Sequence, residues 1–302
     1  MSGALPERRI TYKGFATDST RWDQFSPGDD DIFICTPDKC GTTWTQAITA
    51  LLIFGTPDHG HNPALISPWL DAGLMPLEAM NAMLAGQTHR HFLKTHTPLD
   101  GIDYYPNCTY IAVYRDPRDV YFSLRNHIAN MKMDTHTEWY DDDVAGGFRR
   151  WAEAPHVDGG MELFSLIELV YHFQTFRQFV HLPNVHLFHY SDLKADLPGQ
   201  MQRMAGIFGV DYTADQINTL AEAAGFDHMK KNAAQFAPAA GMDVWRDESA
   251  FFNKGANRQW QSLPTEDLAH YDACIASHLP PEDVHWLQQG GKLPPDQMGR
   301  DE

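Results

Sequence analysis

The stretch DIFICTPDKCGTTW, residues 31–44, joins an apolar strand to a helix through one tight turn. Residues 31–36 form a short apolar run closed by Pro37, as expected for a strand that is buried on both faces of a sheet. Residues 43–54 have the length and the apolar content of a helix, and Gly55 ends it. A strand that leads through a turn into a helix is the first unit of an α/β fold.

Short apolar runs and longer helical segments alternate along the rest of the chain. The patterns predict strands at residues 91–95, 109–114 and 185–190, and helices at residues 117–131, 162–182, 194–208 and 214–223. Strands that alternate with helices imply a parallel sheet with helices on both faces. We therefore expect an α/β fold. No segment in the middle of the chain has the composition of a linker, so we expect a single domain over residues 1–302.

The net charge of the chain is strongly negative. Its 302 residues include 23 Lys and Arg against 40 Asp and Glu, which gives a formal charge of −17. Nucleic acids and anionic membranes are bound through clustered cations, so we expect neither as a partner. An anionic ligand would therefore have to bind in a local positive pocket.

Four cysteines, Cys35, Cys40, Cys108 and Cys274, are spread along the chain. None forms a CxxC pair, and the histidines lack the spacing of a metal site, so neither a disulfide framework nor a metal is expected. The first residues lack the apolar stretch of a signal peptide, and no segment has the pattern of a membrane span. These features predict a reduced, cytoplasmic protein.

The turn at residues 36–44 has the composition of an anion site. A glycine turn at the start of a helix directs backbone N–H groups and the positive end of the helix dipole at one point. Lys39 adds a positive charge, and Thr42 and Thr43 add hydroxyl donors. The turn differs from the triphosphate loop GxxxxGK[ST], because Lys39 precedes the single glycine, Gly41. An ordinary capped helix is the alternative that this pattern leaves open.

An arginine and a serine follow the strand predicted at residues 109–114. Arg115 ends that strand, and Ser123 lies two helical turns further on, so both would lie at the carboxyl edge of the sheet. Ligands of open parallel sheets bind at that edge, and a guanidinium matches the geometry of phosphate. The alternative is a surface salt bridge between Arg115 and Asp116 or Asp119.

Two further segments contain groups suited to catalysis or anion binding. Lys94 and His96 lie at the end of the strand at residues 91–95, and a histidine there can take a proton from an attacking hydroxyl. An isolated histidine is more often structural, so this assignment depends on the other motifs. Residues 251–260, FFNKGANRQW, are typical of a loop that closes on an anion, although such a loop could also balance local acids.

In this order, the segments resemble the sulfotransferase family that uses 3′-phosphoadenosine 5′-phosphosulfate (PAPS), of the cytosolic small-molecule type with bacterial relatives. The similarity covers about residues 10–262 and is carried by PDKCGTTW, FLKTHTPL, VYRDPRDVYFS, FHYSDLK, FDHMKKN and FFNKGANRQW. It implies a three-layer domain with a phosphate loop like that of P-loop nucleotide kinases. It also implies sulfuryl transfer from PAPS to a hydroxyl group, with PAP as the product and no metal.

The resemblance assigns three segments to the cofactor. Residues 36–44 match the phosphosulfate loop, residues 115–123 match the 3′-phosphate motif, and residues 251–260 match a C-terminal cofactor loop. The implied cofactor-binding residues are Lys39, Cys40, Gly41, Thr42, Thr43, Trp44, Arg115, Ser123, Tyr190, Phe226, Asn253, Lys254, Gly255 and Arg258.

The resemblance also assigns roles in catalysis and base binding. His96 matches the general base and Lys94 the lysine beside it. Lys39 would neutralise the charge that grows on the bridging oxygen, and Lys94 would help to hold the transferring group. Trp44 and Phe226 match the residues that sandwich adenine. A sulfuryl group carries less charge than a phosphoryl group, so positioning and charge stabilisation by these residues would suffice.

The chain departs from the family pattern at four cofactor positions. Ala224 falls where a hydroxyl often contacts adenine. Asp38 stands before Lys39, where proline is usual, so a carboxylate lies next to the anion site. Cys40 replaces the commoner serine. Asn253 replaces an arginine of many animal members, so that contact is weakened or passed to Arg258.

The acceptor is a small-molecule hydroxyl compound, and its pocket is specified least by the sequence. Apolar side chains that could line it favour a lipophilic alcohol or phenol. These are Phe15, Trp69, Met75, Met80, Met83, Trp139, Tyr140, Phe148, Trp245 and Phe251. The dimerisation motif of animal members is not recognisable after Trp260, which leaves a homodimer open.

Two other functions compete with sulfuryl transfer. One is a P-loop kinase that uses Mg-ATP, and the order of lysine and glycine in the turn counts against it. The other is a nucleotide-binding protein without turnover. The presence of Lys39, Lys94 and His96 counts against that function.

Overall fold

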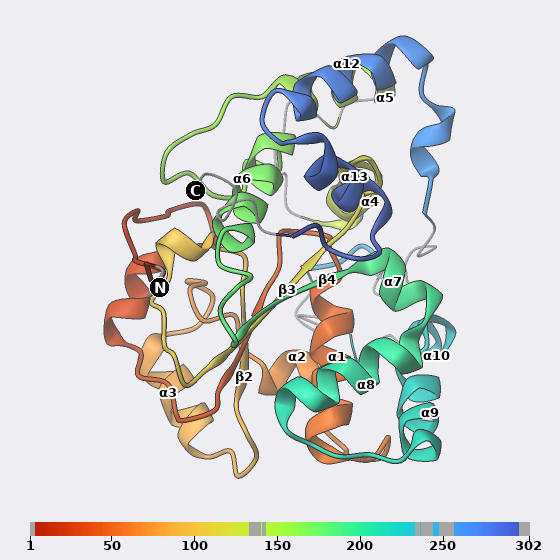
Figure 1. Cartoon of the computed structure of the whole chain (residues 1–302). Helices are drawn as coiled ribbons and strands as arrows, with labels where there is room; N and C mark the ends of the chain where they lie inside the picture. Colours follow the sequence, from red (N-terminus) through yellow and green to blue (C-terminus); the bar gives the residue numbers. More distant parts are fainter. Residues whose placement is uncertain are drawn as a thin grey trace.

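A parallel four-stranded sheet lies at the centre of the molecule, in the spatial order β2-β1-β3-β4 (Figure 1). The computed structural model describes residues 4–132, 140, 143–232, 236, 244–247 and 257–295. The strands are β1 (Ile32–Cys35), β2 (Phe92–Thr95), β3 (Thr109–Tyr114) and β4 (Val185–His189). All four predicted strands are thus confirmed.

Helices of different lengths surround the sheet in the described part of the chain. They are α1 (Thr42–Phe54), α2 (Pro63–Ile66), α3 (Leu77–Ala85), α4 (Pro117–Asn130), α5 (Val144–Glu153), α6 (Leu166–Arg177), α7 (Tyr190–Ala195), α8 (Leu197–Phe208), α9 (Ala214–Ala223), α10 (Phe226–Lys231), α12 (Thr265–Ala276) and α13 (Pro281–Gln289). Short 3₁₀ turns are η1 (Ser19–Gln24), η2 (Leu99–Gly101) and η4 (Gln259–Ser262). Across this described part, no helix has the length and apolar content needed to cross a lipid bilayer.

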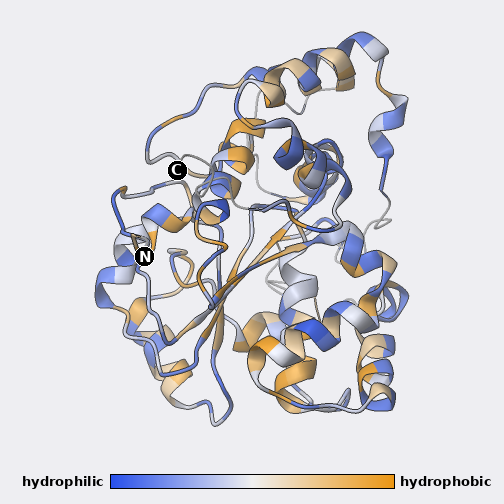
Figure 2. Ribbon diagram, in the orientation of Figure 1, coloured by the Kyte–Doolittle hydropathy of each residue, from blue (hydrophilic) through white to orange (hydrophobic). Residues whose placement is uncertain are grey.

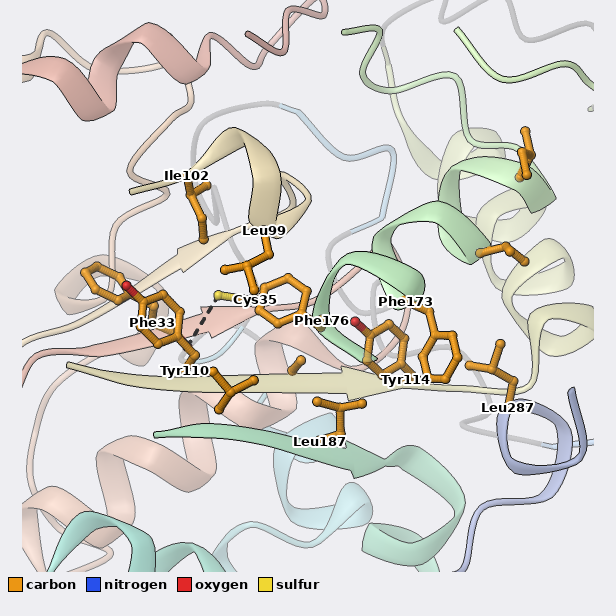
Figure 3. Packing of buried hydrophobic residues seen from close by; sticks show 14 of the residues in the cluster. Phe33, Cys35, Leu99, Ile102, Tyr110, Tyr114, Phe173, Phe176, Leu187 and Leu287 are labelled. Atoms are coloured by element: carbon orange, nitrogen blue, oxygen red, sulfur yellow. Dashed lines mark hydrogen bonds between the residues drawn. The ribbon is translucent and has the colours of Figure 1, made fainter. Parts of the chain in front are cut away.

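Alternate residues of the strands enter two separate hydrophobic cores. Phe33 and Tyr110 face the core that contains α6 and α13 (Figure 3), whereas Ile32 and Ile111 face the core built with α1, α8 and α9. Every residue of β1 and β3 is buried. Figure 2 shows the corresponding hydrophobic colouring along the strands. The sheet therefore has helices on both faces, which confirms the predicted three-layer α/β architecture.

The helix predicted at residues 162–182 is shorter than expected. Glu162 and Phe164 have φ angles of 56° and 53°, a left-handed conformation that a right-handed helix cannot contain. The hydroxyl of Ser165 then accepts the N–H of Glu168 at 3.3 Å and caps α6, which ends at Arg177. The apolar periodicity was correct, but the boundaries were set by local backbone conformation.

The helix predicted at residues 194–208 is in fact two helices. The side chain of Asp196 accepts the N–H of Gly199 at 3.0 Å and starts α8, with Pro198 in its first turn. Tyr190, predicted at the end of a strand, is instead the first residue of α7. The segment predicted as a loop at residues 225–264 contains α10, although part of it lies outside the described residues.

The strand order places a crevice at one edge of the sheet. From β1 the chain passes to β2 on one side, and β3 then pairs with β1 on its other side. In open parallel sheets, the carboxyl ends of strands on either side of such a switch point form the ligand-binding crevice. The segments after β1, β2 and β3 carry Lys39, His96 and Arg115 respectively, so the fold gathers these residues at one edge.

Candidate active site

The turn between β1 and α1 leaves the start of α1 without a side-chain cap. Gly41 occupies the N-cap position with a φ angle of 113°, and Lys39 has a φ angle of 61°. The hydroxyl oxygens of Thr36 and Thr42 lie 2.5 Å apart across the turn. The first N–H groups of α1 therefore lack the side-chain cap of an ordinary helix, and their dipole favours an anion at this point.

We expect replacement of Gly41 by alanine to destabilise the protein by about 1–3 kcal/mol, because the left-handed conformation strains a residue with a side chain. A Cβ atom at this position would also lie 3.1 Å from Cδ2 of Tyr190. Urea unfolding measures the change. Gly206→Ala in α8 is the matched control, because no atom lies within 4 Å of its Cβ position and helix propensity should stabilise it. Equal effects of the two substitutions would contradict this explanation.

Two half-buried lysines supply positive charge beside the turn. Burial lowers the pKa of Lys39 to about 8. The negative charge of Asp38 opposes this shift, whereas the positive charges of Arg115 and Lys94 add to it. Burial likewise lowers the pKa of Lys94 to about 8. The Nζ atom of Lys39 lies 2.9 Å from Nδ1 of His127. A bound anion would offset the cost of burying these ammonium groups.

Arg115 is buried beside the same turn. Its guanidinium lies 4.5 Å from the ring centre of Tyr190, which also lies 5.2 Å from the ring of Trp44. One aromatic ring thus contacts both the turn and the end of β3. Asp116, one of the two acids in the alternative of a surface salt bridge, pairs with Arg118 at 2.9 Å, and Arg115 itself is buried.

The carboxylate of Asp119 holds a distant segment at the start of α4. It accepts the backbone N–H groups of Arg258 and Gln259 at 2.8 and 3.0 Å. The indole of Trp260 donates to Asp116 at 3.1 Å. The end of the predicted C-terminal cofactor loop is therefore fixed next to the predicted 3′-phosphate motif. Sequence reasoning missed this role of Asp119, which it regarded as a helix-start acid or a salt-bridge partner.

Other predicted cofactor residues differ in how far the structure describes them. Ser123 lies half-buried in the second turn of α4. Asn253, Lys254 and Gly255 lie outside the described residues. Cys40 is fully buried, and burial raises its thiol pKa to about 12, so this thiol stays protonated.

The predicted adenine sandwich residues belong to one cluster. Trp44 and Phe226 both pack against the buried residues Ala47 and Met229. The indole N–H of Trp44 donates to the carbonyl of Ala224 at 2.8 Å. This contact fixes the ring of Trp44 beside the start of α10.

His96 is buried at the end of β2 with its two ring nitrogens in different surroundings. Nδ1 lies 2.6 Å from the carbonyl oxygen of Thr36. A carbonyl oxygen can only accept a hydrogen bond, so Nδ1 carries the ring proton. Nε2 is then left as the proton acceptor, and it faces Asp38 at 3.8 Å. The ring also packs edge-on against Trp69, at 4.8 Å. This tautomer suits a general base.

A small, partly open cavity adjoins His96. Its lining is mostly apolar but includes the polar side chains of Asp38, Glu168 and His172. The lining residues are Pro37, Asp38, His96, Pro98, Val120, Leu124, Met161, Phe164, Ser165, Glu168, Leu169 and His172. Burial raises the pKa of Glu168 to about 8, so its carboxyl is mostly protonated at neutral pH.

The cavity is not lined by the apolar residues that we predicted from sequence. Phe148 and Met80 lie in the hydrophobic core, whereas Phe15 and Met75 are 62% and 40% exposed. Trp69 packs on His96, as noted above. Trp139 and Phe251 lie outside the described residues. The composition shows that aromatic residues are abundant. It does not show which of them are buried in the hydrophobic core and which line a cavity.

A second buried histidine, His172 on α6, lines the same cavity. Its Nδ1 lies 3.0 Å from the hydroxyl of Tyr114. Burial lowers the pKa of His172 to about 3, so it remains neutral and is a poor proton acceptor. Sequence reasoning did not single out His172, because a histidine inside an apolar helical pattern carries no signal of its own.

Comparison with known proteins gave consistent similarities. The family model described as "Sulfotransferase domain" matches residues 29–280. Glycolipid sulfotransferases from Mycobacterium bovis and Mycobacterium tuberculosis are 34% identical over 313 and 312 residues, which cover 93% of this chain and 95% of each relative. The solved structure of mouse sulfotransferase SULT7A1 complexed with PAP is 18% identical, with a TM-score of 0.70 over 90% of this chain and 93% of that one.

Proposed function

Because the chain belongs to the sulfotransferase domain family, we propose that it transfers a sulfuryl group from PAPS to a hydroxyl group of a glycolipid. The observation that carries this proposal is the proximity of two lysines to His96 at the carboxyl edge of the sheet. Lys94 and His96 both pack on the ring of Trp69, and His96 lines a cavity. Lys39 lies close enough to Lys94 to interact with it electrostatically. Two half-buried lysines suit a transferring anion, and the neutral histidine suits the proton of the acceptor.

The residues present fit PAPS as the donor. The uncapped start of α1, with Lys39 and Thr43, would hold the phosphosulfate. Arg115 and Ser123 would hold the 3′-phosphate. PAPS supplies the sulfuryl group and a phosphate leaving group.

The adenine and the remaining phosphate contacts would come from other segments. Trp44, Tyr190 and Phe226 would contact adenine, because the first two are in ring contact and Trp44 and Phe226 share one cluster. Lys254 and Arg258 would complete the 3′-phosphate site, and the Asp119 anchor supports this placement of Arg258.

In the proposed reaction, the chain positions the acceptor and moves one proton. Nε2 of His96 accepts the proton of the acceptor hydroxyl while Nδ1–H stays bound to Thr36. The charges of Lys39 and Lys94 stabilise negative charge that develops on the transferring group and on the leaving oxygen. The apolar cavity wall excludes water, which would otherwise compete with the acceptor.

The acceptor class is supported by two observations. The curated relatives at 34% identity are glycolipid sulfotransferases. The cavity combines apolar residues with Asp38 and Glu168, whose oxygens can bind the hydroxyl groups of a sugar. We therefore narrow the sequence-based expectation of a lipophilic alcohol or phenol to a lipid-linked sugar.

Calorimetric titration with PAP and, separately, with Mg-ATP tests the donor. We expect PAP to bind and Mg-ATP not to, and Arg115→Ala to weaken PAP binding about 10- to 100-fold. Arg203→Ala is the matched control, because this guanidinium also stacks on an aromatic ring, 3.9 Å from Phe188, but belongs to α8. Binding of Mg-ATP alone would favour the kinase function instead.

Transfer of labelled sulfate from PAPS tests the acceptor. We expect octyl glucoside to be a better acceptor than 1-octanol or 2-naphthol, judged by kcat/KM. A preference for 2-naphthol would return the acceptor to the phenol class. PAP binding without transfer to any hydroxyl compound would favour the non-catalytic alternative.

A further inference from the structure

Asp38 is placed between the anion site and the cavity. It lies in the turn between β1 and α1, its side chain is 30% exposed, and it lines the cavity that adjoins His96. Its Oδ1 atom lies 3.8 Å from Nε2 of His96, the nitrogen that would receive the acceptor proton. A carboxylate at this distance interacts directly with a charge on the ring.

Of the two histidines that line the cavity, His96 and His172, only His96 faces the carboxylate of Asp38. Both are buried, at 7% exposure for His96 and 2% for His172, and both line the same cavity. His172 is partnered at Nδ1 by the neutral hydroxyl of Tyr114, whereas His96 faces a carboxylate. Burial lowers both pKa values, but only for His96 does Asp38 oppose that effect.

Other charged and titratable groups also face His96. Lys94 of β2 disfavours a charged ring, whereas Asp71, from the segment before α3, favours it. His127 of α4 and His172 of α6 are near enough to interact with the ring. Asp38 has the largest electrostatic effect among these groups, and it favours the imidazolium.

We propose that Asp38 is a positioning residue that stabilises the imidazolium of His96 during sulfuryl transfer, an inference that rests on the proposed function. The acceptor oxygen forms a bond to sulfur as the bond from sulfur to the leaving phosphate oxygen breaks. The acceptor proton passes to Nε2 of His96, beside Oδ1 of Asp38, and afterwards leaves to solvent. The same carboxylate opposes the effect of burial on Lys39 and Lys94, so it keeps these groups charged.

The test is the pH profile of kcat/KM for Asp38→Asn, with PAPS and octyl glucoside. Because Asp38 favours the charged forms of His96, Lys39 and Lys94, we expect both limbs of the profile to move to lower pH, by about one unit. We also expect kcat at neutral pH to fall about 10-fold, with PAP binding changed less than threefold. Asp38→Glu should restore much of the activity. A lower amplitude with unmoved limbs would overturn the inference and indicate a structural role.

An NMR titration of the imidazole signals gives a second readout that needs no acceptor. The signal of His96 is assigned by its loss in His96→Ala, and its pKa should be lower in Asp38→Asn than in the unchanged protein. An equal pKa in both proteins would also overturn the inference. If His96→Ala itself retained transfer, the proposed base would be wrong. If His96→Ala were inactive while Asp38→Asn left both pH limbs in place, only the role of Asp38 would be wrong.

Discussion

We expect His96→Ala to lower kcat for sulfuryl transfer by about 10³-fold, the effect of losing a general base. The reason is that Nε2 of His96 faces the cavity as a proton acceptor, while Nδ1–H is held by the carbonyl of Thr36. PAP should bind to the variant as tightly as to the unchanged protein, because His96 faces the acceptor cavity. Transfer kinetics with labelled PAPS and PAP calorimetry measure the two quantities.

His172→Gln is the control for this result, because it changes a second buried histidine in the same cavity. With its pKa lowered to about 3, His172 cannot gain a proton near neutral pH, so we expect kcat to change less than tenfold. If His172→Gln were the inactive variant and His96→Ala the active one, the two histidines would have to exchange roles.

We expect Lys39→Met to lower kcat by about 10²- to 10³-fold, the usual effect of losing one preorganised group that stabilises transition-state charge. We also expect it to change the pH dependence of PAP binding. Lys39 binds an anion only as the ammonium, and burial lowers its pKa to about 8, so PAP affinity should fall as the pH rises through about 8. The decline should be smaller in Lys39→Met, which keeps Lys94 but lacks the other lysine beside the turn. Calorimetry between pH 7 and 9.5 measures both curves.

Lys13→Met is the control for this second result, since the side chain of Lys13 is 63% exposed and forms a surface ion pair with Asp18 at 3.3 Å. We expect its removal to change neither kcat nor the pH dependence of PAP binding. A decline of equal size in Lys39→Met and the unchanged protein would show that another group titrates in this range.

Strands β1 and β3 could be predicted because they are fully buried. Residues 32–35 and 109–114 are continuous apolar runs in the sequence, and a strand covered on both faces needs such a run. Helix boundaries were harder. Periodicity identifies the buried face of a helix, but Asp196 and the left-handed residues Glu162 and Phe164 decided where α8 and α6 begin.

The grouping of the residues proposed to hold the donor could be predicted because their motifs are local. Lys39 and Gly41 lie in one turn, and Arg115 directly follows a strand, so topology alone brings them to one edge. The acceptor side could not be predicted in this way. Its cavity is formed by single residues of the turn, α4, α6 and the segment before α6, and no spacing rule relates Leu124 to Phe164.

Part of the cavity lining lies far along the chain from the residues proposed to hold the donor. Met161, Phe164 and Leu169 belong to α6 and the segment before it, although Pro37 and Asp38 of the turn also line the cavity. Under the proposed function, we expect substitutions of Met161, Phe164 and Leu169 to alter the range of acceptors while PAP binding stays unchanged. A library confined to these three positions would therefore explore new acceptors with the same donor.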